Sequence, residues 1–184
     1  SNNSLVDNIL PLQEVKTLKN LTAKNTGIQE IGSLKGNVLL ERMDMEGSPV
    51  SSIKDLSELT KLTYLNVNAS QINEVEIPDF LQKRPDVSII YRSETLSKWW
   101  EGIDLDWKKL LSDKFKLSET PSTEELHQLT SVSSLDLERV TFTSLEPLTI
   151  FSNLRKLVLF DAPTMALSPL AQMTKLTSLK LSQL

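Results

Sequence analysis

Apolar residues recur along this chain with a period of 22 residues. Each unit reads L-x-x-L-x-L and then carries apolar residues at places 11, 14 and 17. The stretch 57–75 shows the pattern, with Leu62, Leu65 and Val67 followed by Ile72 and Val75. One such unit cannot bury its leucines alone, whereas stacked units share a continuous core. The pattern therefore predicts a solenoid in which a short strand supplies the first three apolar places of each unit.

The complete units fall into two groups along the chain. They begin at Leu18, Leu40, Leu62, Val132 and Leu154. Only two of their apolar places hold another residue, namely Pro78 and Thr164. The sequence therefore predicts an N-terminal repeat array over 1–92 and a C-terminal repeat array over 132–184.

Partial units flank the complete ones. Their apolar residues are Val6, Ile9 and Leu12 at the start, and Leu176, Leu179 and Leu181 at the end. A further unit is expected to begin at Arg84, with Val87 and Ile89 pointing inward from a terminal strand. The segment 177–181 is expected to be the last strand of its sheet. An unpaired strand edge recruits another strand, so we expect either further repeats or self-association through this edge.

Between the arrays, over 93–131, the apolar period becomes helical. Ser93, Asp104 and Ser122 are expected to cap three helices, and Glu125 completes a capping box with Ser122. The apolar residues of these helices are Leu96, Trp99, Trp100, Ile103, Trp107, Leu110, Leu111, Phe115, Leu126 and Leu129. We expect this helical insert to pack Trp100, Trp107, Leu110 and Phe115 against the end of the first array, because terminal repeats expose apolar edges.

The units resemble those of leucine-rich repeat proteins, specifically the bacterial 22-residue class to which the internalins belong. The resemblance covers 1–92 and 132–184. It implies an α/β solenoid, a right-handed superhelix with a parallel sheet on its concave side, here with two arrays separated by a helical insert. It also implies a non-catalytic scaffold that binds a protein partner through the concave sheet.

The sequence departs from this family at place 9, where the family usually has Asn. The residues there are Thr26, Ser48 and Ser70 in the first array, and Val140, Ala162 and Leu184 in the second. Hydroxyl groups are expected to replace part of the amide's bonding in the first array. Nothing polar remains in the second, which is therefore expected to be irregular or weaker.

Side chains alternate between the two faces of a strand, so places 3, 5, 7 and 8 are expected to point outward. The predicted partner-binding residues are Arg42, Asp44, Tyr64, Asn66, Asn68, Tyr91, Lys156, Val158 and Phe160. Among them Tyr64, Tyr91, Val158 and Phe160 are expected to be exposed between charged groups, a mixture that protein interfaces favour. The alternative is that these are isolated surface aromatics without a function.

The three tryptophans lie close together in the insert, at Trp99, Trp100 and Trp107. They either fill the open end of a core or form a platform on which a sugar ring stacks. Trp99 and Trp100 are adjacent and cannot point the same way on a helix. The alternative function is therefore a cell-surface carbohydrate-binding or adhesive protein that uses the tryptophan-rich insert.

The amino-acid composition limits which kinds of binding and catalysis are possible for this chain. The chain has 20 basic and 24 acidic residues, a net charge of −4 and no cysteine, which disfavours nucleic-acid binding and excludes disulfides and thiolate ligands. His127 is the single histidine, and no nucleophile is placed for it to activate. We therefore expect no catalytic residue, no cofactor and no metal.

No apolar run approaches the ~18 residues that a membrane-spanning helix needs. The first residue is Ser rather than Met, which is compatible with removal of an export signal. An exported or cell-surface location is expected in preference to a cytoplasmic one.

Overall fold

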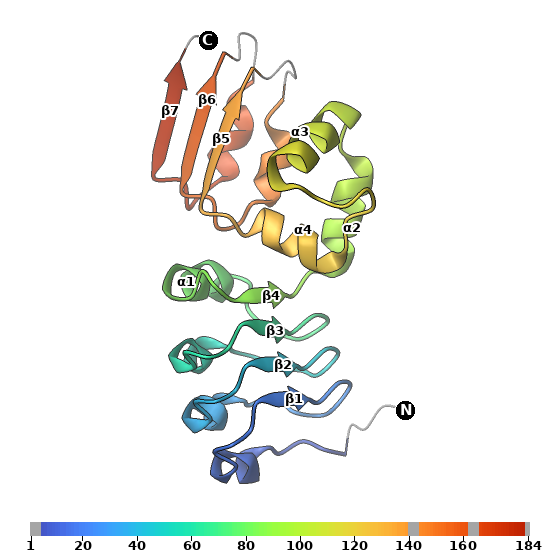
Figure 1. Cartoon of the computed structure of the whole chain (residues 1–184), viewed down its shortest axis with the longest axis vertical. Coiled ribbons are helices and arrows are strands. Elements are labelled where there is room, and N and C mark those ends of the chain that lie inside the picture. Colours follow the sequence, from blue (N-terminus) through green and yellow to red (C-terminus); the bar gives the residue numbers. More distant parts are fainter. Residues whose placement is uncertain (1–4, 140–143, 162–165, 183–184) are drawn as a thin grey trace. The chain divides into compact units, whose positions relative to one another are not determined.

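The computed structural model describes residues 5–139, 144–161 and 166–182 (Figure 1). The chain separates into two compact units, Ser1–Ser93 and Glu94–Leu184. Each unit has its own hydrophobic core, and each is described in turn.

The first unit is built on a parallel sheet with strand order β1-β2-β3-β4. Its strands are β1 (Asn20–Thr22), β2 (Arg42–Asp44), β3 (Tyr64–Asn66) and β4 (Ser88–Ile90). Leu21 lies in register with Met43, and Met43 with Leu65, which confirms the 22-residue step over these strands. Met43 and Leu65 are completely buried, so the first apolar places point into the core as predicted.

Short 3₁₀ helices precede the first three of these strands and return the chain to the sheet. They are η1 (Leu10–Glu14), η2 (Gly32–Gly36) and η3 (Lys54–Glu58). Leu34 and Leu56 occupy place 17 of their units and are completely buried. Each also accepts a backbone hydrogen bond from the residue that ends its 3₁₀ turn. The last apolar place of the unit therefore anchors the return segment to the core.

The last return segment of this unit is different, because an α-helix, α1 (Glu76–Lys83), replaces the 3₁₀ turn. Pro78 lies in its first turn, where a missing N–H costs little. Ile89 consequently pairs with Leu65, a step of 24 residues. The predicted register of this strand was wrong by two residues: Ile89 takes the place expected for Val87, and Tyr91 takes the place expected for Ile89.

The second unit contains three helices followed by a second parallel sheet of order β5-β6-β7. The helices are α2 (Ser93–Gly102), α3 (Leu105–Phe115) and α4 (Thr123–Thr130). The strands are β5 (Ser134–Glu138), β6 (Lys156–Phe160) and β7 (Ser178–Ser182), with 3₁₀ segments η4 (Glu146–Ile150) and η5 (Ser168–Gln172). Leu135, Leu157 and Leu179 lie in register, so the 22-residue step holds here too.

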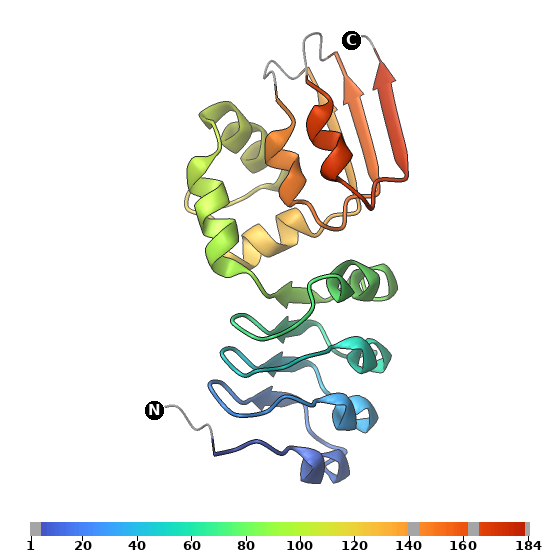
Figure 2. The same cartoon turned by 180° about the vertical axis from the view of Figure 1, so that it is seen from behind.

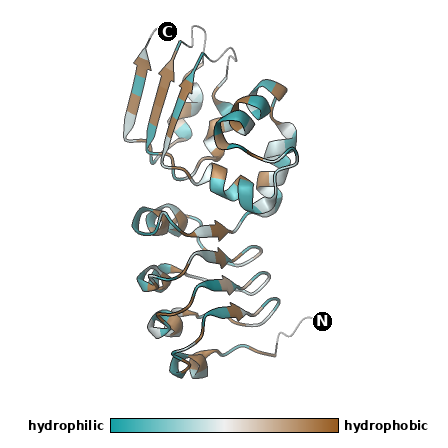
Figure 3. Ribbon diagram, viewed as in Figure 1, coloured by the Kyte–Doolittle hydropathy of each residue, from teal (hydrophilic) through white to brown (hydrophobic). Residues whose placement is uncertain are grey.

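One side of this sheet carries the return segments and the other does not. Figure 2 shows η4 and η5 as orange and red turns on one side of β5–β7, and Figure 1 shows the opposite side uncovered by them. Along the strands, hydrophobic and hydrophilic segments alternate (Figure 3). Leu135, Leu137, Leu157 and Leu159 are buried. The alternating pattern therefore leaves a mostly polar face, which also carries Val158 and Phe160, on the side without return segments.

The three predicted helices are present, but they pack differently from the prediction. Trp107, Leu111 and Leu126 share one core cluster with Leu135 and Leu157 of the second array. Trp100, Leu110 and Phe115 are partly buried against the same cluster. The prediction placed these residues against the end of the first array. In the structure they belong to the core cluster of the second unit, together with the strands that follow them in sequence.

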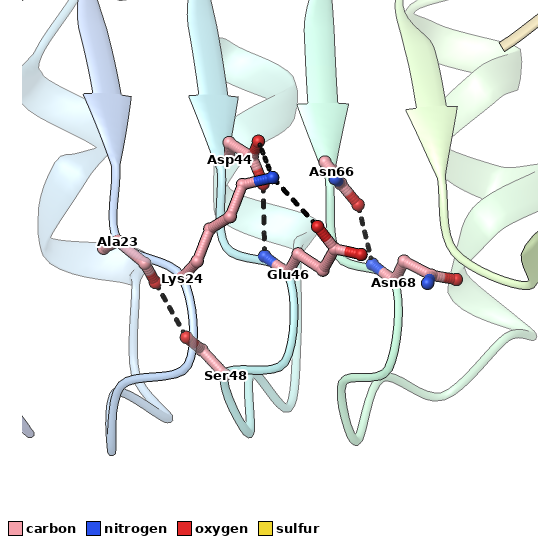
Figure 4. Close-up of polar contacts among 7 residues, drawn as sticks. All are labelled: Ala23, Lys24, Asp44, Glu46, Ser48, Asn66 and Asn68. Carbon is pink, nitrogen blue, oxygen red and sulfur yellow. Dashed lines mark hydrogen bonds and ion pairs between the residues drawn. The ribbon is translucent and has the colours of Figure 1, made fainter. Parts of the chain in front are cut away.

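Hydroxyl groups at place 9 link neighbouring repeats in the first array, as expected. The Oγ1 of Thr26 lies 2.8 Å from the Oγ of Ser48, and Ser48 donates to the carbonyl of Ala23 over 2.8 Å (Figure 4). Ser70 bonds within its own turn, to the N–H of Ile72. The three corresponding residues of the second array, Val140, Ala162 and Leu184, lie outside the described residues.

Candidate functional site

We define the first face as the outward side chains of β1–β3 and of the turns that follow them. Its members are Asn20, Thr22, Lys24, Arg42, Asp44, Glu46, Tyr64, Asn66 and Asn68. Arg42 and Tyr64 lie in register on adjacent strands, and the guanidinium carbon is 4.0 Å from the centre of the tyrosine ring. Such cation–π contacts at exposed sites are worth about 0.5–1 kcal/mol. The pair therefore holds two predicted binding residues together.

A lysine and two carboxylates form the most regular polar cluster of this face. The Nζ of Lys24 lies 2.9 Å from carboxylate oxygens of both Asp44 and Glu46 (Figure 4). The side-chain hydrogen bonds to Glu46 and then to Asp44 raise the pKa of Lys24 above its usual value. Lys24 therefore remains charged, and the three groups neutralise one another in part.

Two of the predicted binding residues also shape the backbone. Asp44 accepts a hydrogen bond from the N–H of Glu46 over 3.3 Å, and Asn66 accepts one from the N–H of Asn68 over 3.0 Å (Figure 4). Asn68 in turn accepts from the N–H of Ser93. Asn66 is only 6% exposed, so the expectation that it projects from its strand without supporting the fold was wrong.

Tyr91 does not lie on an outward face. It is 8% exposed and belongs to the core cluster of the first unit. The longer return through α1 moves it to the inward place that Val67 occupies one repeat earlier. The expectation that Tyr91 is an exposed aromatic residue is therefore corrected.

We define the second face as the outward side chains of β5–β7. Its members are Ser134, Asp136, Glu138, Lys156, Val158, Phe160, Ser178, Lys180 and Ser182. Asp136, Val158 and Lys180 lie in register across the three strands. Phe160 is 37% exposed and Val158 is half-buried. The predicted residues Lys156, Val158 and Phe160 thus follow one another along the same strand, whereas Arg42, Asp44 and Tyr64 belong to the first unit.

The tryptophans contribute mainly to the core of the second unit. Trp107 is 1% exposed. The Nε1 of Trp99 donates to the carbonyl of Pro147 over 3.1 Å, and its ring meets Phe151 edge-on at 6.1 Å. Trp100 is half-buried, with its ring centre 5.9 Å from that of Trp99. The core-filling alternative is thus observed for Trp107, while Trp99 and Trp100 are both half-buried.

The single histidine has a structural environment. His127 is 1% exposed, and its Nδ1 lies 2.7 Å from the carbonyl of Thr123 one turn earlier in α4. Among the residues that the structure describes, no group of three or more His, Asp or Glu side chains is arranged to hold a metal ion. No helix within the described ranges has the length and apolarity needed to cross a membrane.

Three buried polar residues that link neighbouring repeats were missed from the sequence. Asn37 donates to the carbonyls of Leu12 and Val15, each over 2.9 Å. Arg84 donates to the carbonyls of Leu59 and Leu62 and pairs with Asp86, and Asn153 donates to the carbonyl of Ser131. The available signal was a polar residue within the few positions that precede the first place of a unit, where the carbonyls at the end of the preceding return segment need donors.

No protein-family model matches the chain, and no curated protein matches it in sequence. Similar solved structures exist. An internalin C2 of Listeria monocytogenes is 16% identical with a TM-score of 0.42, and the match covers 95% of this chain and 66% of that protein. A leucine-rich repeat protein of Leptospira interrogans is 17% identical with a TM-score of 0.39, over 96% of this chain and 52% of that one.

Another Listeria monocytogenes internalin is 19% identical with a TM-score of 0.35, over 95% of this chain and 38% of its own. The chain therefore spans less than two thirds of the length of these proteins. Its own architecture is clear from the paired strands and the 3₁₀ returns at 22-residue steps. The chain is built of 22-residue repeats, each with a short inward-facing strand, and the solved structures to which it is similar include two internalins of Listeria monocytogenes.

Proposed function

We propose that this chain is a non-catalytic interaction module that binds a protein partner through the outward faces of its repeat sheets. The observation that carries this proposal is that inward residues of each strand form the core while the residues between them face outward. Met43, Leu65 and Leu157 are completely buried, while their neighbours in sequence point outward at a constant register. Such a sheet can present many different side chains to a partner without changing its core.

The outward residues have the character that protein interfaces use. Phe160 and Val158 offer apolar contact, and Arg42 and Tyr64 form an amphipathic pair beside carboxylates. Interfaces combine such aromatic and arginine anchors with a polar rim. The exported or cell-surface location expected from the sequence is part of the same proposal.

Site-specific photo-crosslinking tests the binding function. The crosslinker replaces Tyr64 on the first face, Phe160 on the second, or Leu105, an exposed residue on α3 that serves as control. We expect adducts with a discrete protein partner from at least one face position and none from Leu105. Adducts formed from Leu105 alone would contradict binding through the sheets.

A second candidate is carbohydrate binding at Trp100, favoured because this residue is only half-buried. Aromatic rings offer a flat apolar surface with a polar edge, which suits sugar rings. A glycan array with the wild type and Trp100→Ala separates this candidate from protein binding. Retention of specific glycans that Trp100→Ala loses would favour it over the sheet faces.

We also propose self-association through the edge of β7, as the sequence predicted for the last strand of this sheet. β7 is the last strand of its sheet among the described residues, and Leu179 and Leu181 on it are exposed. Unpaired edges recruit strands. Light scattering over a concentration series of the 184-residue chain tests this, with Leu181→Lys expected to reduce any association, since charged residues on an edge disfavour pairing.

A further inference from the structure

The charged residues of the two faces differ in whether they already have partners. On the first face Lys24 pairs with both Asp44 and Glu46, and Arg42 covers the ring of Tyr64. On the second face, within the ranges that the structure describes, Asp136, Glu138, Lys156 and Lys180 form no ion pair. The charges of the second face are therefore available to an incoming partner, whereas those of the first face are partly neutralised.

The charges of the second face are also sorted by strand. The outward residues of β5 after Ser134 are acidic, those of β6 after Lys156 are apolar, and Lys180 is the basic residue of β7. Asp136, Val158 and Lys180 form one row across the sheet. Neighbouring strands lie about 4.8 Å apart, so this row runs from a carboxylate over an apolar residue to an ammonium group within about 10 Å.

The next row repeats the acidic and apolar parts, because Glu138 lies in register with Phe160. Phe160 and Val158 lie two residues apart on β6 and point to the same side. They form a small apolar stripe with carboxylates along one side and Lys180 on the other. An apolar stripe supplies contact area, while flanking charges of opposite sign select the partner and its orientation.

We propose that the second face binds an extended protein segment that crosses the strands with a basic residue, an apolar residue and an acidic residue at alternate positions. The basic side chain would meet Asp136 and Glu138, the apolar one Val158 and Phe160, and the acidic one Lys180. Alternate residues of an extended segment lie about 6.7 Å apart, and long charged side chains span the remaining difference. This proposal rests on the proposed protein-binding function and adds which face binds and what it recognises.

A displayed peptide library tests this with the full chain as bait. Positions i, i+2 and i+4 are randomised in an otherwise polar extended peptide. We expect enrichment of Arg or Lys at one end, an aliphatic or aromatic residue in the middle, and Asp or Glu at the other end. Either direction of the peptide satisfies the face, so both orders count as the expected result.

Variants of the face assign the bound peptides to it. Phe160→Ala is expected to weaken the enriched peptides about tenfold or more, as loss of an anchor residue does. Lys180→Glu is expected to weaken them about two- to fivefold, as exposed ion pairs do. Asp136→Lys should shift the selected pattern from one basic and one acidic end towards two acidic ends. Leu105→Ala, an exposed apolar change on α3 outside this face, is the control for Phe160→Ala and should change nothing.

The outcomes separate this inference from the proposed function. Enrichment of peptides that lack the charge pattern would overturn the assignment of binding to the second face. Peptides whose affinity is unchanged by Phe160→Ala and Asp136→Lys would overturn it as well. Weakening by Tyr64→Ala instead leaves protein binding in place but moves it to the first face. A concentration-dependent dimer that Phe160→Ala abolishes, with no peptide enriched, identifies a second copy of the chain as the occupant and overturns the segment. Absence of any polypeptide ligand for either face contradicts both proposals.

Discussion

At the scale of single residues, the turn after each strand depends on one backbone conformation. The residue at place 8 of each complete repeat unit has a positive φ angle. The angles are 53° for Asn25, 71° for Gly47, 55° for Ala69, 52° for Arg139 and 55° for Asp161. Only glycine adopts this left-handed region without steric cost. The repeat therefore imposes a conformation that Ala69 accepts at some cost in stability.

This leads to a prediction about Ala69 and Gly47. We expect Ala69→Gly to raise the free energy of unfolding by about 0.5–1 kcal/mol, since removal of the left-handed strain outweighs the added freedom of the unfolded chain. Gly47→Ala should lower it by more than that, because its Cβ would also collide with the side chain of Asn25. Urea unfolding of both variants measures these changes. A loss of stability in Ala69→Gly would show that the strain is absent.

The capping box of α4 makes a second residue-scale prediction, concerning pH. Glu125 accepts hydrogen bonds from the N–H groups of Ser122 and Ser118 and from the hydroxyl of Ser118, at 2.8, 2.8 and 2.9 Å. These bonds lower the pKa of Glu125 from 4.5 to about 2, with the Ser122 N–H as the largest cause. Because the folded pKa is depressed, the stability it contributes is fully present above pH 4.5 and is lost as the pH falls towards 2.

The measurement compares wild type with Glu125→Gln across this range. We expect the difference in unfolding free energy between the two proteins to shrink steadily between pH 4.5 and pH 2. Ser122→Ala at neutral pH is expected to cost about 1 kcal/mol, as loss of an N-cap does. A wild-type advantage that is independent of pH would show that the carboxylate is not held by these donors.

At the scale of elements, α1 changes the register of the strand that follows it. A 24-residue step places Tyr91 inward, whereas a 22-residue step would place it outward. Tyr91→Ala is therefore expected to cost about 3 kcal/mol as a core truncation. Tyr64→Ala, on an outward place one strand earlier, should cost only about 1 kcal/mol through the lost contact with Arg42. Chemical unfolding of the two variants checks this, and equal small effects would contradict the shifted register.

The helix α3 offers a matched pair for the core of the second unit. Trp107 is 1% exposed and packs with Leu111, whereas Leu105 on the same helix is 81% exposed. We expect Trp107→Ala to destabilise the protein by about 3–5 kcal/mol and Leu105→Ala to change stability by less than about 0.5 kcal/mol. The tryptophan emission of the wild type should also be blue-shifted and weakly quenched by acrylamide. Fully quenched emission would show that the insert does not form this core.

At the scale of the whole molecule, the described residues form two separate hydrophobic clusters. The first is made only of residues up to Tyr91, and the second only of residues from Leu96 onwards. We expect fragments 1–93 and 94–184 each to fold, because each contains all the residues of its own cluster. Circular dichroism and denaturant titration of the two fragments measure this. A fragment without cooperative unfolding would show that its cluster is insufficient by itself.

The two units also differ in the charges that their outward faces offer to a binding partner. The first face has charges that are paired internally, and the second has charges sorted by strand around Val158 and Phe160. Both follow from the same 22-residue geometry, which places one residue of each repeat beside its equivalent in the next. The difference between the faces therefore depends on which side chains occupy equivalent places.

The sequence by itself determined the repeat, its inward residues and the three helices of the insert. These features are local or periodic: burial selects the same places in every unit, and Ser122 with Glu125 signals a helix start within four residues. The hydroxyls at place 9 were predictable for the same reason, since Thr26 and Ser48 lie one period apart. The outward places of Arg42, Tyr64 and Phe160 also followed from the period alone.

Only the tertiary structure decided the rest. The two extra residues before β4 gave no local signal that they would be absorbed in α1, and this placed Tyr91 in the core. The apolar faces of α2–α4 could pack against any apolar surface of suitable shape. Their packing with Leu135 and Leu157 depends on contacts between residues far apart in the sequence, which a local pattern does not specify. Likewise, whether Asp44 or Asp136 finds a cation depends on which side chains the sheet brings within about 4 Å, and a periodic pattern specifies places without specifying those contacts.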